Sequence, residues 1–427
     1  MLIEFSVGNY LSFKEKVTFS MVASQIKSGD AKVDENNIFP VDGELSLLKS
    51  AAVYGANASG KSNLVKAMNF MRFFVLSSSK ETQITDKIDV RPFKLSTETI
   101  GEPSHFEIVF ICNKKIYRYG FEVDHQQIIS EWLFHVPKKR ESYLFKRTKN
   151  DIKTTKVFSE GEGLEKRTRK NALFISVVAQ FNGTISSKIL SFFGENLNVI
   201  SGLETEFYRE IAVDYFDEYG SDIIKIIKKL DLGIDRIQIS TKAVLEDELP
   251  RGIPEQLRKI ILMNKLESSD IQTFHKKYDS EGAVVGNETF SLDRDESHGT
   301  QKLFAFAGPI LETLKRGEIL VIDELDARLH PLITKTIIEL FNSNETNPHN
   351  AQLIFMTHDT NLLTNTIFRR DQIWFTEKDR QGATDLYSLV EYNIKNEDSF
   401  ESDYIKGRYG AIPFIGNLRK VIVEIDG

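Results

Sequence analysis

The stretch Gly55-Ala56-Asn57-Ala58-Ser59-Gly60-Lys61-Ser62 decides the fold of this chain. It matches the pattern G-x-x-x-x-G-K-[ST], follows a strand-like run at 47–54 and opens into a helix-like run at 63–68. The glycines allow a tight turn that directs successive backbone N–H groups toward an anion. The N-terminus of the helix adds partial positive charge. This strand–loop–helix context predicts a phosphate-binding loop.

The residues of this loop have predicted roles in binding ATP and Mg²⁺. Lys61 can reach the β- and γ-phosphates of a nucleotide, and the Ser62 hydroxyl suits a Mg²⁺ ligand. The residues predicted to bind the nucleotide here are Gly55, Asn57, Ala58, Ser59, Gly60, Lys61, Ser62 and Asn63. The alternative is a glycine-rich turn without a ligand, which the complete motif and an acidic strand later in the chain disfavour.

The composition narrows the class of protein. The chain has 427 residues with 41% hydrophobic content, enough for a sizeable core and more than one sub-domain. Its net charge of −7 argues against a uniformly basic nucleic-acid binder. The single cysteine, Cys112, is expected in the core and cannot form an internal disulfide. With no signal peptide and no run of about 18 apolar residues, we expect a cytoplasmic protein without a membrane partner.

Two kinds of pattern alternate along the chain and predict an α/β fold. Residues 1–20 are typical of a hairpin, and residues 104–148 of an antiparallel meander. Residues 171–230 have helical spacing, and a short helix is expected at 253–264. We therefore predict three parts: 1–170 with the phosphate loop and the meander, 171–290 as a mainly helical insertion with short strands at 234–240 and 271–278, and 291–427 as a second α/β lobe.

Acidic and histidine side chains end the apolar strands of the last part. The strand 318–322 is followed by Asp323 and Glu324, and the strand 352–357 by His358. Buried parallel strands carry ligand chemistry at their carboxyl ends. Asp323 is therefore predicted to hold Mg²⁺, Glu324 to polarise the attacking water, and His358 to contact that water or the γ-phosphate. A lone histidine is more often structural, so His358 depends on its neighbours.

The segment Ser297-His298-Gly299-Thr300-Gln301-Lys302 resembles the signature motif of the ABC-type ATPases. The resemblance implies an ABC-type ATPase head, with a P-loop core sheet, an antiparallel β sub-domain and an inserted helical sub-domain. It also implies a head-to-tail dimer in which Ser297 and Gly299 of one protomer meet the γ-phosphate held by Lys61 of the other. The alternative is that Ser297 is an ordinary N-cap before a helix.

Three further positions carry roles only through this resemblance. Asp326 matches the D-loop, which communicates across the dimer. Gln180 is the candidate for the Q-loop residue and hence for a Mg²⁺ ligand. Residues 9–14 match the region that passes near the adenine.

Within the ABC-type ATPases, the chain resembles the SMC-like branch and, most closely, the AAA/OLD-type ATP-binding proteins of bacterial defence. The run Asp323-Glu324-Leu325-Asp326-Ala327-Arg328-Leu329-His330-Pro331 and the segment 407–413 carry this resemblance. It implies a TOPRIM-like nuclease as effector. The part after His358 is too short for a fused TOPRIM domain, so the effector is expected to be a separate protein. The arms and cysteine hook of DNA-repair relatives are absent.

A basic stretch at 138–170 contains 12 Lys/Arg and 5 Asp/Glu, a local charge of +7. It is a candidate contact for nucleic acid or for the effector. The alternative is a solvated surface, which is the usual role of a charge run.

These observations predict an ATPase that is slow or stimulated by a partner. As a head-to-tail dimer or a higher homo-oligomer, it would act as an ATP-gated sensor or scaffold for a separate effector nuclease in anti-phage defence. Two alternatives stay open: an SMC-like ATPase of DNA repair or DNA-end processing, and an antitoxin-like scaffold that binds ATP tightly and turns over slowly.

Overall fold

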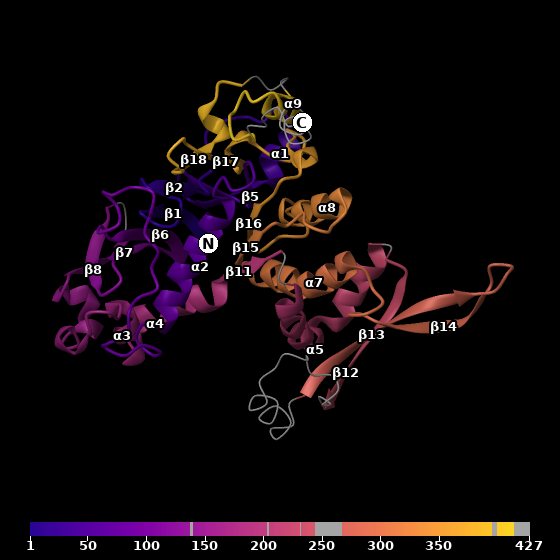
Figure 1. The fold of residues 1–427 in the computed structure, drawn as a ribbon, viewed down its shortest axis with the longest axis horizontal. Coiled ribbons are helices and arrows are strands. Elements are labelled where there is room, and N and C mark those ends of the chain that lie inside the picture. The colour runs from indigo at the N-terminus through magenta and orange to yellow at the C-terminus, as the bar shows by residue number, and fades with distance from the viewer. Residues whose placement is uncertain (137–139, 203–204, 231, 244–266, 395–398, 414–427) are drawn as a thin grey trace, which may run out of the picture. The chain divides into compact units, whose positions relative to one another are not determined.

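The structure is a computed structural model that describes residues 1–136, 140–202, 205–230, 232–243, 267–394 and 399–413 (Figure 1). The chain forms two compact units. The first consists of Met1–Ser201, Thr313–Ala327 and Thr334–Gly427, and the second of Gly202–Glu312 and Arg328–Ile333. The helix predicted at 253–264 lies outside the described residues.

A six-stranded sheet forms the centre of the first unit. Its strand order is β11 (Leu197–Ser201), β15 (Ile319–Asp323), β16 (Gln352–Met356), β5 (Ser50–Tyr54), β17 (Ile373–Lys378) and β18 (Thr384–Ser388). The first five strands are parallel and β18 is antiparallel to β17. Every residue of β5 and β16 is buried, as expected for parallel strands covered on both faces. The continuous apolar runs in the sequence predict this arrangement.

A seven-stranded antiparallel sheet is the second large sheet of this unit. Its order is β10 (Asp151–Thr154), β9 (Ser142–Thr148), β8 (Ile128–Val136), β7 (Lys115–Val123), β6 (Ser104–Cys112), β1 (Leu2–Gly8) and β2 (Val17–Ser20). The predicted hairpin and meander are both present, and β1 pairs with β6, so they form one sheet. The structure thus confirms the predicted α/β fold with a P-loop sheet and an antiparallel sub-domain.

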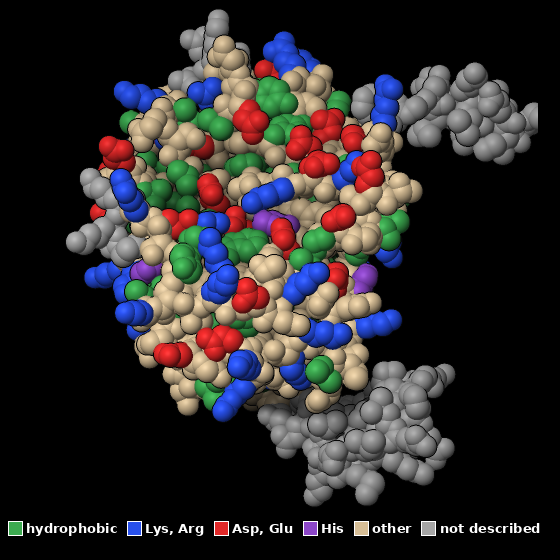
Figure 2. All heavy atoms as spheres, turned by 90° about the vertical axis from the view of Figure 1, so that its left-hand side faces the viewer, with side chains coloured by type: hydrophobic (Ala, Val, Ile, Leu, Met, Phe, Trp, Pro, Cys, Tyr) green, Lys and Arg blue, Asp and Glu red, His purple; other side chains and the backbone are tan. Residues whose placement is uncertain are grey.

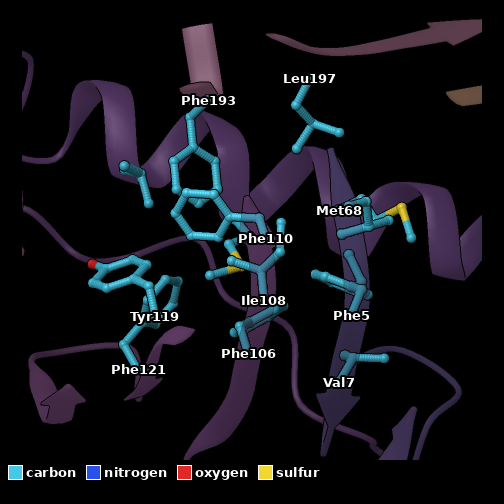
Figure 3. Packing of buried hydrophobic residues seen from close by; sticks show 14 of the residues in the cluster. Phe5, Val7, Met68, Phe106, Ile108, Phe110, Tyr119, Phe121, Phe193 and Leu197 are labelled. Atoms are coloured by element: carbon cyan, nitrogen blue, oxygen red, sulfur yellow. The ribbon is translucent and has the colours of Figure 1, made fainter. Parts of the chain in front are cut away.

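The hydrophobic core joins the two sheets through α2 (Lys61–Ser77), the helix that follows the phosphate loop. Figure 3 shows the β6 side chains Phe106, Ile108 and Phe110 in a row, with Met68 of α2 near Phe5. Buried residues of β5, β15 and β16 belong to the same core cluster. The packing of α2 therefore fixes the phosphate loop relative to both sheets.

Two local expectations are corrected. The run 47–54, expected as one strand, is divided between two sheets: β4 (Leu45–Leu48) pairs with β3 (Ile38–Asp42), and β5 enters the parallel sheet. The side chain of Lys49, between β4 and β5, donates to Asn344 Oδ1 (2.5 Å). Cys112 is only half-buried, because it lies at the end of β6 and packs on the margin of the core.

The second unit contains α5 (Thr205–Lys229), the antiparallel strands β12 (Ile234–Ala243), β13 (Glu267–Tyr278) and β14 (Val284–Ser291), and most of α7 (His298–Arg316). The strands predicted at 234–240 and 271–278 are present. The unit differs in extent from the predicted insertion at 171–290. α3 (Phe174–Gln180) and α4 (Thr184–Ser191) lie in the first unit, and so does β11.

Glu131 of β8 explains why α3 belongs to the first unit. Its fully buried carboxylate accepts hydrogen bonds from Phe174 N (2.7 Å), Ile175 N (3.1 Å) and the Tyr119 hydroxyl (3.1 Å). It also lies 3.5 Å from Arg147 Nη1. Burial raises the pKa of Glu131, whereas Arg147 and the backbone donors oppose that rise. One carboxylate thus joins the N-terminus of α3 to the antiparallel sheet.

We expect Glu131→Gln to lower the free energy of unfolding by about 2 kcal/mol, the usual contribution of hydrogen bonds to a charged group. The amide keeps one acceptor oxygen but leaves the buried Arg147 charge without its counter-ion. Denaturant unfolding followed by circular dichroism measures the change. Glu141→Gln is the control, because its partner Arg118 is more exposed. Equal midpoints for the two variants would contradict this role of Glu131.

Candidate functional site: the phosphate loop and its acidic strand

The phosphate loop joins β5 to α2 and requires its two flanking glycines. Gly60 is the N-cap of α2 and has a φ of +119°. A Cβ atom at Gly60 would lie 2.6 Å from Thr384 Cγ2, and one at Gly55 would lie 2.6 Å from Thr376 Oγ1. The loop is therefore pressed against β17 and β18, with its other side open to a pocket.

Lys61 folds back onto the loop. Its Nζ donates to Gly55 O (2.8 Å) and Ala56 O (3.1 Å), and the residue is 5% exposed. Burial lowers the pKa of Lys61 to about 8, and the charges of Asp323 and nearby acids oppose this. An anion in the loop would supply the counter-charge that the buried ammonium needs.

Asp323 ends β15, two strands from β5 in the sheet. Burial raises the pKa of Asp323, and the neighbouring Ser62 hydroxyl opposes that rise. Asp323 Oδ1 is buried and has no hydrogen-bond partner among the described residues. A buried oxygen without a partner is costly in a native protein unless a ligand completes it.

Ser62 and Asp323 fit a Mg²⁺ ion that also binds nucleotide phosphates. Mg²⁺ is usually held by one or two carboxylates together with substrate phosphates. No group of three or more His, Cys, Asp or Glu side chains within the described ranges forms a metal cage of its own. The donor set therefore fits Mg²⁺ arriving with a nucleotide.

Glu324 lines the same pocket, which has a volume of about 500 Å³. Its φ of +54° lies in the left-handed region, which is uncommon for a residue with a side chain. The residues around the pocket are Asn57, Ala58, Ser59, Gly60, Lys61, Ser62, Asn63, Glu324, His358 and Lys378. Strained backbone of this kind is found at functional sites, where it directs a side chain toward the chemistry.

His358 and Asp326 complete the open end of the site. His358 N donates to Asp326 Oδ2 (3.4 Å), and Asp326 Oδ1 is buried without a partner among the described residues. Partial burial and the charge of Lys61 lower the pKa of His358, whereas Asp326 and Asp323 oppose this. A lowered pKa keeps the imidazole neutral near pH 7, so it can donate one hydrogen bond and accept another.

Ser297 and Gly299 belong to the second unit, at the N-terminus of α7. Thr300 N donates to Ser297 Oγ (3.2 Å), so Ser297 caps α7, as the alternative interpretation predicts. Ser297 Oγ also lies 2.9 Å from Thr300 Oγ1, where either hydroxyl can be the donor. When Thr300 donates, the Ser297 proton is available for another acceptor. A Cβ atom at Gly299 would lie 2.7 Å from Arg328 O, so the backbone contact requires glycine.

The structure does not bring Gln180 into the pocket. Gln180 is the exposed last residue of α3, which is packed on the antiparallel sheet through Glu131. It is absent from the residues around the phosphate loop.

Part of the segment 9–14 does lie beside the loop. Leu11 and Ser12 line a second pocket of about 320 Å³ with Phe93, and this pocket shares Asn63 and Lys378 with the first. Asn63 Nδ2 donates to Ser12 Oγ (2.7 Å). The two adjoining pockets have room for the phosphates and the base of one nucleotide.

Sequence reasoning missed Thr376, Thr384 and Lys378. Thr376 Oγ1 lies 2.6 Å from Ser59 Oγ. Thr384 Oγ1 is bonded to both Ser59 O and Ser12 Oγ (2.8 Å each). These contacts link residues more than 300 positions apart, as from Ser59 to Thr376, so no local pattern reveals them.

We expect Thr384→Val to weaken ATP binding about tenfold, because the loop loses the hydroxyl that bonds Ser59 O and Ser12 Oγ. The isosteric change keeps the packing against Gly60. Titration with a fluorescent ATP analogue measures the dissociation constant, and Thr346→Val, on the exposed surface, is the control. An unchanged constant would show that the loop holds its shape without Thr384.

A family profile matches residues 50–364, under the description "AAA domain, putative AbiEii toxin, Type IV TA system". The chain belongs to this family. No curated protein matches the sequence. Among solved structures, the SMC head domain from Thermotoga maritima is 12% identical with a TM-score of 0.41, covering 91% of this chain and 98% of that one. The recombination mediator RecF with ATP is 14% identical with a TM-score of 0.33, covering 91% and 99%.

The family match confirms the coarse form of the predicted function, a P-loop protein of the AAA ATPase type. It matches the phosphate loop, the segment from Ser297 to Asp326 and His358 within one domain family. The placement among OLD-type defence proteins and the TOPRIM-like partner remain predictions. Among the described residues, no helix combines the length and the apolar character needed to cross a bilayer.

Two cations of the basic stretch have structural roles. Arg147 is 3% exposed and donates to Lys149 O (2.6 Å) and Ala172 O (2.7 Å). Arg169 donates to the backbone carbonyls of Ser78, Ser79 and Thr82. On the face drawn in Figure 2, Lys and Arg are interspersed with Asp and Glu. The donors of Arg147 and Arg169 are therefore directed at backbone carbonyls, whereas Lys146, Lys166 and Arg167 of the same stretch are exposed.

Proposed function

We propose that this protein binds ATP with Mg²⁺ in the pocket of the phosphate loop and hydrolyses it to ADP and phosphate. The buried Asp323 oxygen without a partner, beside Ser62 and Lys61, is the observation that carries the proposal. Its ordinary explanation is a ligand that brings a cation and phosphates together at this place. Membership of the AAA domain family supports the same ligand.

The residues of the pocket have different roles in the proposed hydrolysis. Lys61 leaves the carbonyls of Gly55 and Ala56 and pairs with the β- and γ-phosphates. Ser62 and Asp323 would hold Mg²⁺, which neutralises phosphate charge when bound. Glu324 accepts a proton from the attacking water, and neutral His358 orients that water or the γ-phosphate. Turnover is expected to be slow in the monomer, because the pocket is open and water is not excluded.

A second protomer would close the site. We infer a head-to-tail dimer, in which Ser297 and Gly299 of each protomer contact the γ-phosphate held by Lys61 of the other, with Asp326 near the same interface. Ser297 precedes a helix of 19 residues, whose N-terminus favours anions. Ser297 would donate its hydroxyl proton to the phosphate while Thr300 Oγ1 donates to Ser297, and Gly299 permits a close backbone approach.

The dimer would then act as an ATP-gated sensor or scaffold. The resemblance to AAA/OLD-type defence proteins suggests a separate TOPRIM-like nuclease as its effector in anti-phage defence. The family description names a toxin of a type IV toxin–antitoxin system, which also fits a two-component defence role. The exposed cations of 138–170 offer a contact for nucleic acid or for that effector. For Gln180 to act as the proposed Q-loop residue, closure of the dimer would have to move α3 toward the pocket of the phosphate loop.

Complementation between two inactive variants tests the dimer. Lys61→Ala removes the phosphate contact of one protomer, and Ser297→Arg blocks the signature that serves the other. Each variant alone is expected to lack ATPase activity. A head-to-tail heterodimer has one intact composite site, so an equimolar mixture should recover about one quarter of wild-type turnover.

A mixture of Lys61→Ala with Glu324→Gln is the matched control. Both of its defects lie in the loop half of the composite site, so no heterodimer contains an intact one. Recovery in the control, or none in the test mixture, would contradict the head-to-tail arrangement. Loss of ATP binding in Ser297→Arg alone would contradict the assignment of Ser297 to the partner's site.

A further inference from the structure

The residue before the signature serine is fixed by two side chains of β13. Glu296 Oε1 accepts a hydrogen bond from Thr273 Oγ1 (2.5 Å) and lies 2.6 Å from His275 Nε2. The Glu296 side chain is 11% exposed, that of His275 is 24% exposed, and Thr273 is buried. When the carboxylate is ionised, His275 must donate this bond. A carboxylate that makes two short hydrogen bonds and is largely shielded from solvent has a well-defined position.

The orientation of His275 is also constrained. Its ring packs edge-on against Phe290 of β14, with centroids 5.0 Å apart and planes at 86°. β13 is the middle strand of the three-stranded sheet, so its backbone is paired on both sides. The imidazole that holds Glu296 is therefore a rigid part of the sheet.

A second tie holds the same segment from its other side. Gln301 Nε2 donates to Leu292 O (3.0 Å), Asp293 O (3.1 Å) and Glu296 O (3.2 Å). Gln301 N also donates to Ser297 O (3.0 Å). These hydrogen bonds from Gln301 thus fix the turn that leads from β14 into α7 on both sides of Ser297.

We infer that Glu296 is a positioning residue for the signature serine, held by Thr273 and His275 of β13. The inference rests on the proposed head-to-tail dimer, in which Ser297 must reach a γ-phosphate on the partner. A donor contributes to such a site only when it lies within a fraction of an ångström of its acceptor. Glu296 provides that accuracy, because it ties the backbone of the adjacent residue to a sheet.

This arrangement gives the three-stranded sheet a role in the ATPase cycle. Beyond His275, residues 276–290 of the β13–β14 hairpin are exposed. A shift of β13 relative to α7 would move the Glu296 carboxylate and with it the serine. The three-stranded sheet therefore determines how accurately each protomer places its Ser297 hydroxyl for the partner's γ-phosphate.

The experiment uses the full chain and three variants. Glu296→Gln weakens the acceptor, His275→Ala removes one donor, and His275→Gln restores a donor at a similar position. Glu288→Gln is the matched control, because Glu288 pairs with Lys277 (2.7 Å) on the exposed part of the same sheet. Hydrogen exchange of the amides at 297–301, without nucleotide, reports the hold on the segment.

Exchange of these amides is expected to be about tenfold faster in Glu296→Gln and His275→Ala. It should stay at the wild-type rate in Glu288→Gln and be nearly restored in His275→Gln. In the second measurement, the variants are placed in a Glu324→Gln background and the mass is followed against ATP concentration. Glu296→Gln should raise the midpoint of dimer formation about tenfold, while the affinity of the dilute monomer for ATP is unchanged.

Unchanged exchange in Glu296→Gln would overturn the inference. Faster exchange with wild-type dimer formation would also overturn it, because the serine would not need this positioning. If the chain with an intact Glu296 fails to dimerise with ATP, the proposed dimer itself is wrong. That pattern differs from a dimer that forms equally well with and without Glu296, which defeats the positioning role alone.

Discussion

Replacing Glu324 with Gln is expected to slow ATP hydrolysis by about 10²-fold or more, the usual contribution of a positioned general base. The amide has nearly the same shape but a much lower basicity, so it cannot accept the proton of the attacking water. The left-handed backbone at φ +54° is unaffected by this exchange and keeps the side chain in the pocket. Phosphate release under single-turnover conditions measures the rate.

Nucleotide binding should survive this change, because Lys61 and Ser62 are intact. The variant should therefore accumulate with ATP bound, and its solution mass should double with ATP and Mg²⁺. Glu345→Gln, on the exposed surface, is the control for the loss of one charge. Turnover at the wild-type rate would exclude Glu324 as the base and leave His358 as the next candidate.

Other outcomes for the mass are equally informative. A mass that is already above a dimer and ignores ATP would favour a constitutive scaffold over an ATP-gated one. A monomer with bound nucleotide in both conditions would contradict an autonomous dimer, and the search would turn to a required partner.

The parts of the site that sequence predicts are those encoded locally. The phosphate loop depends on eight consecutive residues, and its glycines reflect the close approach of Thr376 and Thr384. Asp323 and Glu324 are recognisable because an apolar strand ends at an acidic pair. In each case the chemistry and the backbone constraint occupy the same short stretch.

The parts that sequence misses depend on partners far along the chain. Thr384 supports Ser59, 325 positions away, and nothing around Thr384 marks it as part of a nucleotide site. Arg147 and Arg169 add to a local charge count, yet their donors are used by backbone carbonyls. A count of charged residues does not show which carbonyl groups lie near them, because the fold determines where those carbonyls are placed.

Substituting Lys61 with Met is expected to separate binding from stability. ATP affinity should fall by about 10²–10³-fold, because the phosphates lose the desolvated charge they pair with. The nucleotide-free protein should nevertheless be more stable than the wild type, since burial disfavours the ammonium and lowers the pKa of Lys61 to about 8. Met fills a similar volume without that charge.

The effect of pH on this gain has a definite sign. Between about pH 8 and the ordinary pKa near 10.5, the unfolded chain binds a proton at Lys61 that the folded protein has released. Wild-type stability therefore rises through this window, and the full penalty of the buried charge is present below pH 8. The lost bonds to Gly55 O and Ala56 O offset part of the gain, which leaves about 1–2 kcal/mol at pH 7.

Denaturant unfolding of the two nucleotide-free proteins at pH 7 and pH 9.5 measures this gain. The advantage of Lys61→Met should be largest at pH 7 and should shrink toward pH 9.5. ATP with Mg²⁺ should stabilise the wild type by mass action and leave the variant almost unchanged. A variant less stable than the wild type at pH 7 would show that the ammonium belongs to the loop's own architecture. A more stable variant that has lost ATP would show that Lys61 is kept at a cost to the fold for the sake of the phosphate.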